Sequence, residues 1–246
     1  MKKITLLLVL WMSFATAYAQ TITKTTKLDA NSIVKDETGS TYPYAIWQKL
    51  LQTGSYAIKP NGTATTTTTE FLLYKLTEEE KATAKKKNAE LSAKLPKPRT
   101  SDAFREGDKF RFDKMKDLAG IKYDFKKDTG KVVVFNFWFI NCPPCKKEIP
   151  ELNELVEKYK ENKDIVFIAI ALDDAYALKD FLKYTPFNYS IIPDGRFYAQ
   201  KYGIKSYPTH VIVGKDGLIK FSTIGLARNT VYWVDKTIKE QTLINH

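Results

Sequence analysis

The chain has 246 residues, a formal net charge of +11 at pH 7 and only two cysteines. This length accommodates one domain of ordinary size and a smaller unit. The positive charge does not indicate nucleic-acid binding, because the sequence lacks a compact basic motif interleaved with aromatic residues. A zinc site is disfavoured as well, since zinc normally takes four ligands and the only histidines are His210 and His246.

The first 19 residues have the features of a secretory signal peptide. Lys2 and Lys3 precede an apolar core, and Ala17-Tyr18-Ala19 fits the small-x-small cleavage motif. Cleavage after Ala19 lowers the formal charge from +11 to +9, since it removes two lysines and no acid. A membrane anchor would need a longer apolar run. We therefore expect export, with a mature chain that begins at Gln20 and does not span the membrane.

Residues 20–100 are predicted to form a small α+β unit. Its expected elements are strands over 21–28 and 32–35, a helix over 44–51, and strands over 55–59 and 63–76. The last two strands are joined by Pro60-Asn61-Gly62, and Asn-Gly between β-rich runs is a strong hairpin signal. Nothing in this unit resembles a catalytic constellation, and whether it contacts a substrate or a partner stays open.

A highly charged helix is predicted to end this unit. Thr77-Glu78-Glu79-Glu80 has the form of a capping box, so we expect a helix over residues 78–95. The segment Leu95-Pro96-Lys97-Pro98 should end that helix and serve as a linker to the second domain, residues 104–246.

The two cysteines lie between a predicted buried strand and a predicted helix. The continuous apolar and β-branched run from Lys131 to Phe139 suits a strand buried on both faces. Asn141 is the expected N-cap of the helix that follows. The positive end of a helix favours an anion, so Cys142 should form a reactive thiolate. Cys145, one turn inside the helix, should be less exposed and resolve a mixed disulfide formed on Cys142.

The other elements predict an α/β sheet with helices on both faces. They are short strands over 104–112 and 121–125, a strand over 165–172, a helix from Asp173-Asp174 to Lys183, a strand over 189–192, a helix over 197–202, hairpin strands over 209–213 and 218–224, and a final helix over 227–244.

The segment FNFWFINCPPCKKEIP resembles the active site of thioredoxin-fold proteins. It is most similar to exported thiol–disulfide oxidoreductases of the TlpA/ResA type, which carry a redoxin (AhpC/TSA-type) domain. The resemblance rests on Phe137-Trp138, Pro150 and Ser206-Tyr207-Pro208-Thr209, and extends over residues 104–246. It implies a thioredoxin-like central mixed sheet flanked by helices, with the inserted strand and helix of TlpA/ResA-like proteins, beside the small α+β N-terminal unit.

The resemblance also implies a set of site residues. Cys142 and Cys145 would be the redox pair, and Pro208 would follow a cis peptide bond that faces them. Tyr207 would offer main-chain groups to an extended substrate, and Trp138 would help to bind it. The exported relatives place a carboxylate at the position of Glu148, where it could act as general acid and base toward Cys145.

Two residues leave alternatives open at this point. Glu148 could instead be a solvated residue on the helix surface. His210 could be a titrating group that tunes the thiols, but we favour an ordinary strand residue with satisfied hydrogen bonds.

The resulting hypothesis is a periplasmic protein-disulfide reductase that needs no cofactor or metal beyond the redox-active disulfide Cys142–Cys145. The resemblance implies that a membrane thiol-electron transporter recharges it and that exported disulfide-containing proteins, such as apocytochrome c, are its substrates. A disulfide-forming oxidase or isomerase would use the same site in reverse, and a non-catalytic binding module is a further alternative. A peroxiredoxin-like peroxidase is disfavoured, because Phe139 stands where that family requires threonine.

Overall fold

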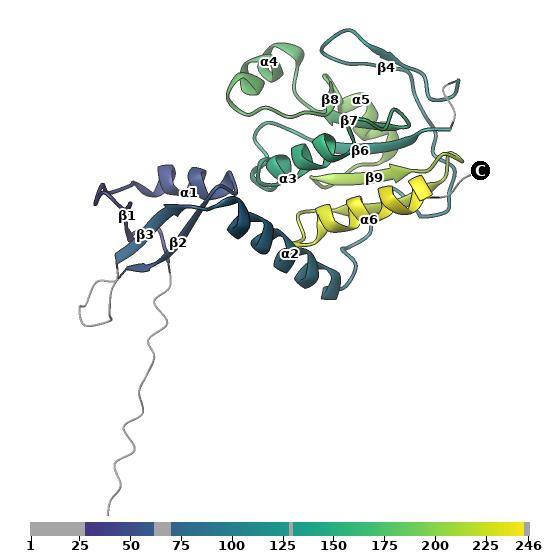
Figure 1. The fold of residues 1–246 in the computed structure, drawn as a ribbon. Helices are drawn as coiled ribbons and strands as arrows, with labels where there is room; N and C mark the ends of the chain where they lie inside the picture. The colour runs from purple at the N-terminus through teal and green to yellow at the C-terminus, as the bar shows by residue number, and fades with distance from the viewer. Residues whose placement is uncertain (1–27, 62–69, 128–129, 244–246) are drawn as a thin grey trace, which may run out of the picture.

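The computed structural model describes residues 28–61, 70–127 and 130–243. The predicted signal peptide and the loop 62–69 lie outside the described residues, as does the strand expected over 21–28 except for its last residue. Figure 1 shows a small N-terminal unit joined through a long helix, α2, to a larger C-terminal unit. In these described ranges no helix is both long and apolar enough to cross a membrane.

A five-stranded mixed sheet, in the order β10-β9-β6-β7-β8, forms the centre of the larger unit. Its middle strand is β6 (Val132–Trp138), and all seven residues of β6 are buried, as the apolar run predicted. On one side β6 pairs in parallel with β7 (Ile165–Ala171), which pairs in parallel with β8 (Ser190–Ile192). On the other side it pairs antiparallel with β9 (Thr209–Val213), which forms the predicted hairpin with β10 (Ile219–Ile224).

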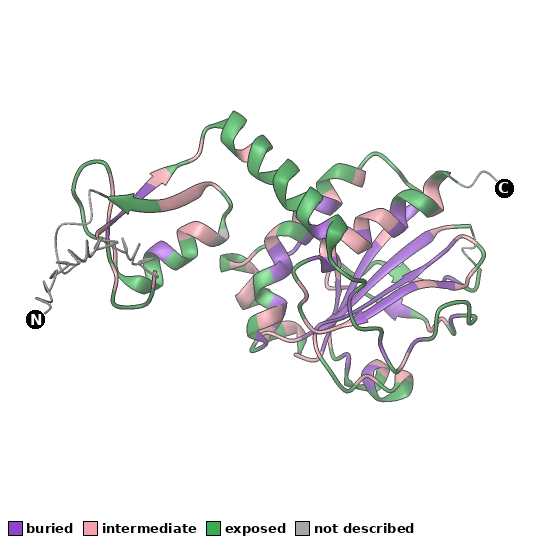
Figure 2. Ribbon diagram, turned by 90° about the horizontal axis from the view of Figure 1, so that it is seen from below, coloured by how far each residue is buried: buried purple, intermediate pink, exposed green. Residues whose placement is uncertain are grey.

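Helices cover both faces of this sheet, which confirms the predicted architecture (Figures 1 and 2). The first face packs against α3 (Pro143–Tyr159), α4 (Ala175–Tyr184) and α6 (Thr230–Leu243). The second face packs against α5 (Arg196–Tyr202) and an aromatic-rich segment that leads into β6. Because side chains alternate along a strand, β6 contributes residues to both cores.

The predicted strand over residues 104–112 is wrong. This stretch forms turns, and Lys109 makes only an isolated bridge to Leu218. Phe104 and Phe110 are nevertheless buried, because their rings pack in stacked geometry against each other and against the aromatic residues of β6. Their apolar spacing therefore reflects packing on the face of the sheet rather than pairing at its edge. Beyond this stretch, β4 (Met115–Lys116) and β5 (Lys122–Tyr123) form a short two-stranded sheet.

The N-terminal unit is a three-stranded sheet covered on one face by α1 (Tyr44–Gln52). Its central strand, β3 (Glu70–Lys75), pairs in parallel with β1 (Ile33–Lys35) and antiparallel with β2 (Tyr56–Asn61). The buried core of the unit is small and consists of Val34, Trp47, Phe71 and Leu73.

The predicted tight turn at Pro60-Asn61-Gly62 is wrong. Pro60 pairs with Phe71 and Asn61 pairs with Glu70, so both residues belong to β2 and the connection comprises residues 62–69. The strand accepts Pro60 because β2 lies at the edge of its sheet, where a missing N–H leaves no neighbouring strand unpaired.

Helix α2 (Glu78–Lys94) begins with the predicted capping box, formed by Thr77 and Glu80. After it, the segment expected to be a linker is anchored against the larger unit. The Asn229 side-chain amide donates hydrogen bonds to the carbonyl groups of Ser92 (3.4 Å) and Pro96 (3.0 Å). The Arg99 carbonyl accepts bonds from the Thr223 hydroxyl (2.8 Å) and the Ile224 N–H (3.1 Å).

Replacement of Asn229 by alanine should loosen this junction. Loss of the two bonds, about 1 kcal/mol in net stability, corresponds to an approximately five-fold larger population of the open segment. Limited trypsin digestion should therefore cleave after Arg99 about five times faster than in the wild type. Asn162→Ala, in an exposed turn, is the control. An unchanged cleavage rate would show that Asn229 does not hold the segment.

Candidate active site

Cys142 and Cys145 form a disulfide where β6 gives way to α3. Both residues are only 2% exposed, so the expected difference in exposure between them is not present. The disulfide belongs to the core between the sheet and the helices α3, α4 and α6. In this oxidised state the two sulfur atoms are therefore part of the packed interior.

The N-cap of α3 is Cys142 itself, and the prediction of Asn141 at this position is wrong. Cys142 has an extended backbone, and its Sγ accepts a hydrogen bond from the Cys145 N–H (3.3 Å). Pro143 and Pro144 occupy the first helical positions, where a missing N–H breaks no helical bond. The Cys142 sulfur thus lies at the positive end of a helix, which favours a thiolate there once the disulfide is reduced.

The Tyr207–Pro208 peptide bond is cis, as the resemblance implied, and it precedes β9. The carbonyl group of Pro208 accepts a hydrogen bond from the Gly225 N–H (2.8 Å), which joins this loop to the end of β10. Tyr207 is half-buried, and its ring meets the ring of Phe139 edge to face at 5.3 Å. Burial raises the pKa of Tyr207, against an opposing contribution from Arg196. Phe139 and Tyr207 pack against the core that contains the disulfide.

Trp138 is completely buried, so the structure does not support the expected substrate contact of its side chain. Its ring packs against Phe181 (5.6 Å between centroids) and Phe187 (5.4 Å). The Trp138 side chain therefore contributes to the packed core behind the site.

Glu148 is buried within α3, which excludes the alternative of a solvated surface residue. Its Oε1 accepts a hydrogen bond from Asn136 Nδ2 at 2.9 Å, and His210 Nε2 also lies 2.9 Å from this oxygen. Its Oε2 is buried and has no hydrogen-bond partner among the described residues. Glu148 lies three residues after Cys145 in α3, and this spacing places both side chains on the same helix face.

His210 was expected to be an ordinary strand residue with satisfied hydrogen bonds; it does lie in β9, and its partner there is Glu148 of the site. Asn136 of β6 and His210 of β9 are direct partners in the sheet register. Both point to the face covered by α3, as do Val134 and Ile212, which lie two residues away along the same strands. The signal that could have identified His210 is therefore its alternation with Ile212.

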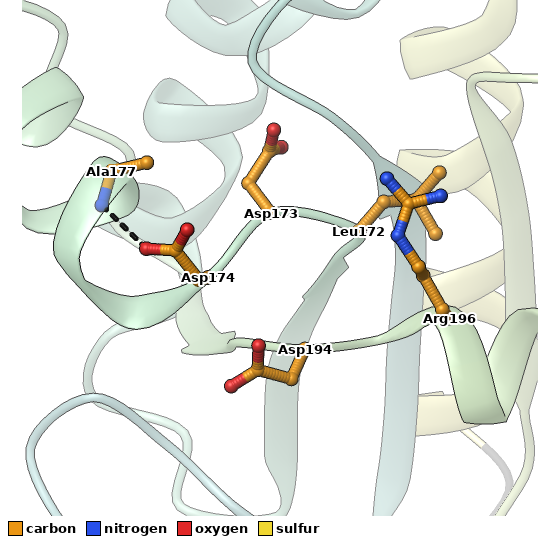
Figure 3. Close-up of a pocket in the computed structure, with 6 residues that line it drawn as sticks. All are labelled: Leu172, Asp173, Asp174, Ala177, Asp194 and Arg196. Atoms are coloured by element: carbon orange, nitrogen blue, oxygen red, sulfur yellow. Dashed lines mark hydrogen bonds between the residues drawn. The ribbon is translucent and has the colours of Figure 1, made fainter.

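A shallow pocket of about 290 Å³ lies between the segment that joins β7 to α4 and the start of α5 (Figure 3). Its lining residues are Leu172, Asp173, Asp174, Ala177, Asp194 and Arg196. Two of these acids have local structural roles. Asp173 Oδ2 accepts the Ile140 N–H (2.7 Å), and Asp174 caps α4. Among the described residues, no group of histidine, cysteine and acidic side chains is arranged to hold a metal ion.

Known proteins match the part of the chain that carries this site. The AhpC/TSA family matches residues 107–222. The thiol-disulfide oxidoreductase ResA of Bacillus thuringiensis subsp. konkukian is 39% identical over 105 residues, which are 42% of this chain and 60% of ResA. ResA of Halalkalibacterium halodurans is 28% identical over 129 residues, which are 52% of this chain and 73% of that protein. This chain thus covers less than two thirds of the first of these relatives.

Solved structures agree on the fold. A Chlorobium tepidum structure described as a thiol:disulfide interchange protein DsbE superposes with a TM-score of 0.50 at 24% identity, over 56% of this chain and 98% of that one. A Bacteroides thetaiotaomicron structure described as a protein disulfide isomerase superposes with a TM-score of 0.51 at 21% identity. This superposition covers 59% of this chain and 94% of that one. At this level of identity the likeness establishes the fold alone. Together with the match of the AhpC/TSA family to residues 107–222, it supports a thioredoxin-like fold for this part of the chain, which is similar to proteins of the TlpA/ResA type.

Proposed function

We propose that this protein is an exported thiol–disulfide oxidoreductase that reduces disulfide bonds in other exported proteins. The observation that carries the proposal is the Cys142–Cys145 pair at the positive end of α3, with the buried carboxyl group of Glu148 one turn further along that helix. The ResA relatives are named as enzymes of this class, which supports the assignment.

The geometry supports a two-step exchange. In the reduced protein, the Cys142 thiolate attacks a substrate disulfide and forms a mixed disulfide, because the helix end and the Cys145 N–H stabilise its charge. Cys145 then displaces the substrate from Cys142 and closes the internal disulfide. Glu148, on the same face of α3, is the group that takes the Cys145 proton.

Substrate recognition is assigned to the loop before β9. Main-chain groups of Tyr207, next to the cis bond at Pro208, would pair with an extended segment of the substrate. The adjacent rings of Tyr207 and Phe139 would offer it apolar contact.

The reducing direction of electron flow is proposed from the few main-chain N–H groups at the start of α3. Pro143 and Pro144 have no N–H groups, so among the first three helix residues only Cys145 can donate a main-chain bond to the Cys142 sulfur. A less stabilised thiolate favours a reductant over an oxidant. A disulfide-forming oxidase or isomerase, which would run the same site in reverse, is the alternative that the potential measurement below tests.

The proposed setting is the bacterial periplasm, reached through the predicted signal peptide with cleavage after Ala19. The oxidised disulfide must then be reduced by a partner, and a membrane thiol-electron transporter is the donor we propose. Exported proteins with disulfide bonds, apocytochrome c among them, are the proposed substrates.

The reduction potential of the Cys142–Cys145 pair should lie near that of thioredoxin, at about −270 mV. Equilibration of the protein with dithiothreitol buffers, followed by thiol alkylation, measures it. A potential near that of strong disulfide-forming oxidants, about −120 mV, would reject the reductase direction and favour the oxidase.

Serine variants of the two cysteines should differ in a characteristic way. The reduced Cys142→Ser variant should lose the reduction of insulin disulfides, because it lacks the attacking thiolate. Reduced Cys145→Ser should instead accumulate a mixed disulfide with the substrate, visible on a non-reducing gel, because it cannot resolve the intermediate. If either variant keeps wild-type turnover, the domain does not act through this dithiol, and a non-catalytic binding role becomes the better account.

Replacement of Glu148 by glutamine should slow disulfide reduction at neutral pH by about 100-fold, since loss of a general acid–base group typically has an effect of 10²–10⁴-fold. Stopped-flow measurement of the second step isolates this effect. The matched control is Glu154→Gln, on the same helix, where the carboxylate is exposed and paired with Lys85. Equal rates in both variants would show that Glu148 is only structural.

A further inference from the structure

We propose that His210 is a positioning residue that holds Glu148 as a carboxylate, so that the Glu148–His210 pair manages the Cys145 proton. This inference rests on the proposed exchange reaction and assigns a specific role in it to His210, whose interpretation the sequence left open. It follows from the contacts of Glu148, from their burial, and from the charges that surround them.

Both N–H contacts of Glu148 converge on one carboxylate oxygen. Asn136 Nδ2 and His210 Nε2 each lie 2.9 Å from Oε1. Two donors directed at the same oxygen stabilise the ionised form of a carboxyl group. The other oxygen, Oε2, has no partner among the described residues, which leaves its lone pairs available for a proton.

Burial makes a cationic partner necessary for this ionised form. Glu148 is 2% exposed and His210 is 0% exposed, so neither group has a hydration shell that would stabilise a charge. Among the described residues, no lysine or arginine nitrogen lies within 4 Å of the Glu148 carboxylate. A protonated His210 would make the pair neutral overall, whereas a neutral imidazole would leave an uncompensated buried anion.

Apart from Lys147 and Lys85, whose charges oppose the raised pKa of Glu151, the other titratable groups around the pair are acidic or neutral. Cys142 and Cys145 lie at the start of α3, and Glu151 follows Glu148 on the same helix. Burial raises the pKa of Glu151, and the charges of Glu154 and Glu148 add to the effect. Tyr189, just before β8, is fully buried, and burial followed by the charge of Glu148 raises its pKa well above the ordinary value. From β10, the residue opposite His210 is Thr223, which does not titrate.

The proton steps balance within this site. Before resolution, Cys145 is a thiol, Glu148 a carboxylate and His210 an imidazolium. The Cys145 proton passes to Glu148 Oε2, and the thiolate attacks Cys142 Sγ. The Cys142–Cys145 bond forms, the bond from Cys142 to the substrate breaks, and the substrate sulfur leaves with the electron pair and takes up the proton from Glu148. His210 keeps its proton throughout, and the total charge of the buried site is the same before and after the exchange.

The protonation state of His210 can be measured directly in the intact protein. The chain has only two histidines, so ¹⁵N-histidine NMR of the oxidised protein gives two sets of ring signals, and a His246→Ala variant assigns them. We expect His210 to be an imidazolium, with both ring nitrogens protonated, at pH 7. A neutral tautomer for His210 at pH 7 would overturn the proposal. This measurement needs no substrate, so it decides the pairing whether or not the protein is a reductase.

A double-mutant cycle tests whether the pair acts on the reaction. His210→Gln keeps a side-chain donor but cannot carry the proton, and it should slow resolution of the mixed disulfide about 10-fold. In a Glu148→Gln background the same substitution should have no further effect, because His210 acts only through Glu148. Equal slowing in both backgrounds would reject this coupling.

Thr223→Val is the matched control for the cycle. Thr223 is buried opposite His210 in the neighbouring strand, and it bonds Arg99 rather than Glu148. This variant should keep the wild-type resolution rate. If the wild type reduces no disulfide while the NMR result holds, the proposed function fails and the His210–Glu148 pairing stands.

Discussion

The packing of β6 on both of its faces is the constraint on which this structure depends. Alternate residues of the strand face two different cores, with Val132, Val134 and Trp138 on the side of α3, and Phe135 and Phe137 on the aromatic side. A slip of one residue would exchange the two sets, so the register with β7 and β9 is strongly fixed. That register places Asn136 on the same face as the disulfide and ends the strand where the helix that carries both cysteines must begin.

A polar residue at this depth requires partners. Asn136, Glu148 and His210 come from a strand, a helix and a neighbouring strand. Asn136 Nδ2 and His210 Nε2 both contact Glu148 Oε1, and these two nitrogens lie 3.3 Å from each other. Such an arrangement rigidifies the core but leaves little tolerance for loss of one member. Glu148 Oε2 and Asn136 Oδ1 remain without partners among the described residues. Orphaned buried acceptors are rare in purely structural networks, and here they belong to two residues of the site proposed to transfer a proton.

Local patterns in the sequence were sufficient for the parts of the site that a short segment determines. The buried run predicted β6, Asn141 as the expected cap placed the helix start within one residue, and the resemblance of the SYPT segment implied the cis bond before Pro208. The N-cap at Cys142 was missed because Asn is the commoner cap residue, which favoured Asn141. The helix begins one residue later because Pro143 and Pro144 suit the first helical positions.

Nonlocal register decides which partners these residues find. Trp138 was expected to contact substrate and is buried, while His210 was expected to be a strand residue with satisfied hydrogen bonds and has Glu148 as its partner. For both residues, the burial and the contacts of the side chain depend on which face of the strand the helices cover. Phe104 and Phe110 also could not be interpreted from local sequence alone. Their spacing fits a strand, but they are buried because their rings pack on Phe137 and Phe135 of β6.

The same register connects the site to the N-terminal unit. Thr223 and Ile224 of β10 bond the Arg99 carbonyl, and these two residues pair with His210 and Thr209 of β9. The segment that enters the domain is therefore fixed to the strand next to the one that carries the buried histidine. The region before residue 104 is thus part of the physical environment of the site, although the family match begins only at residue 107.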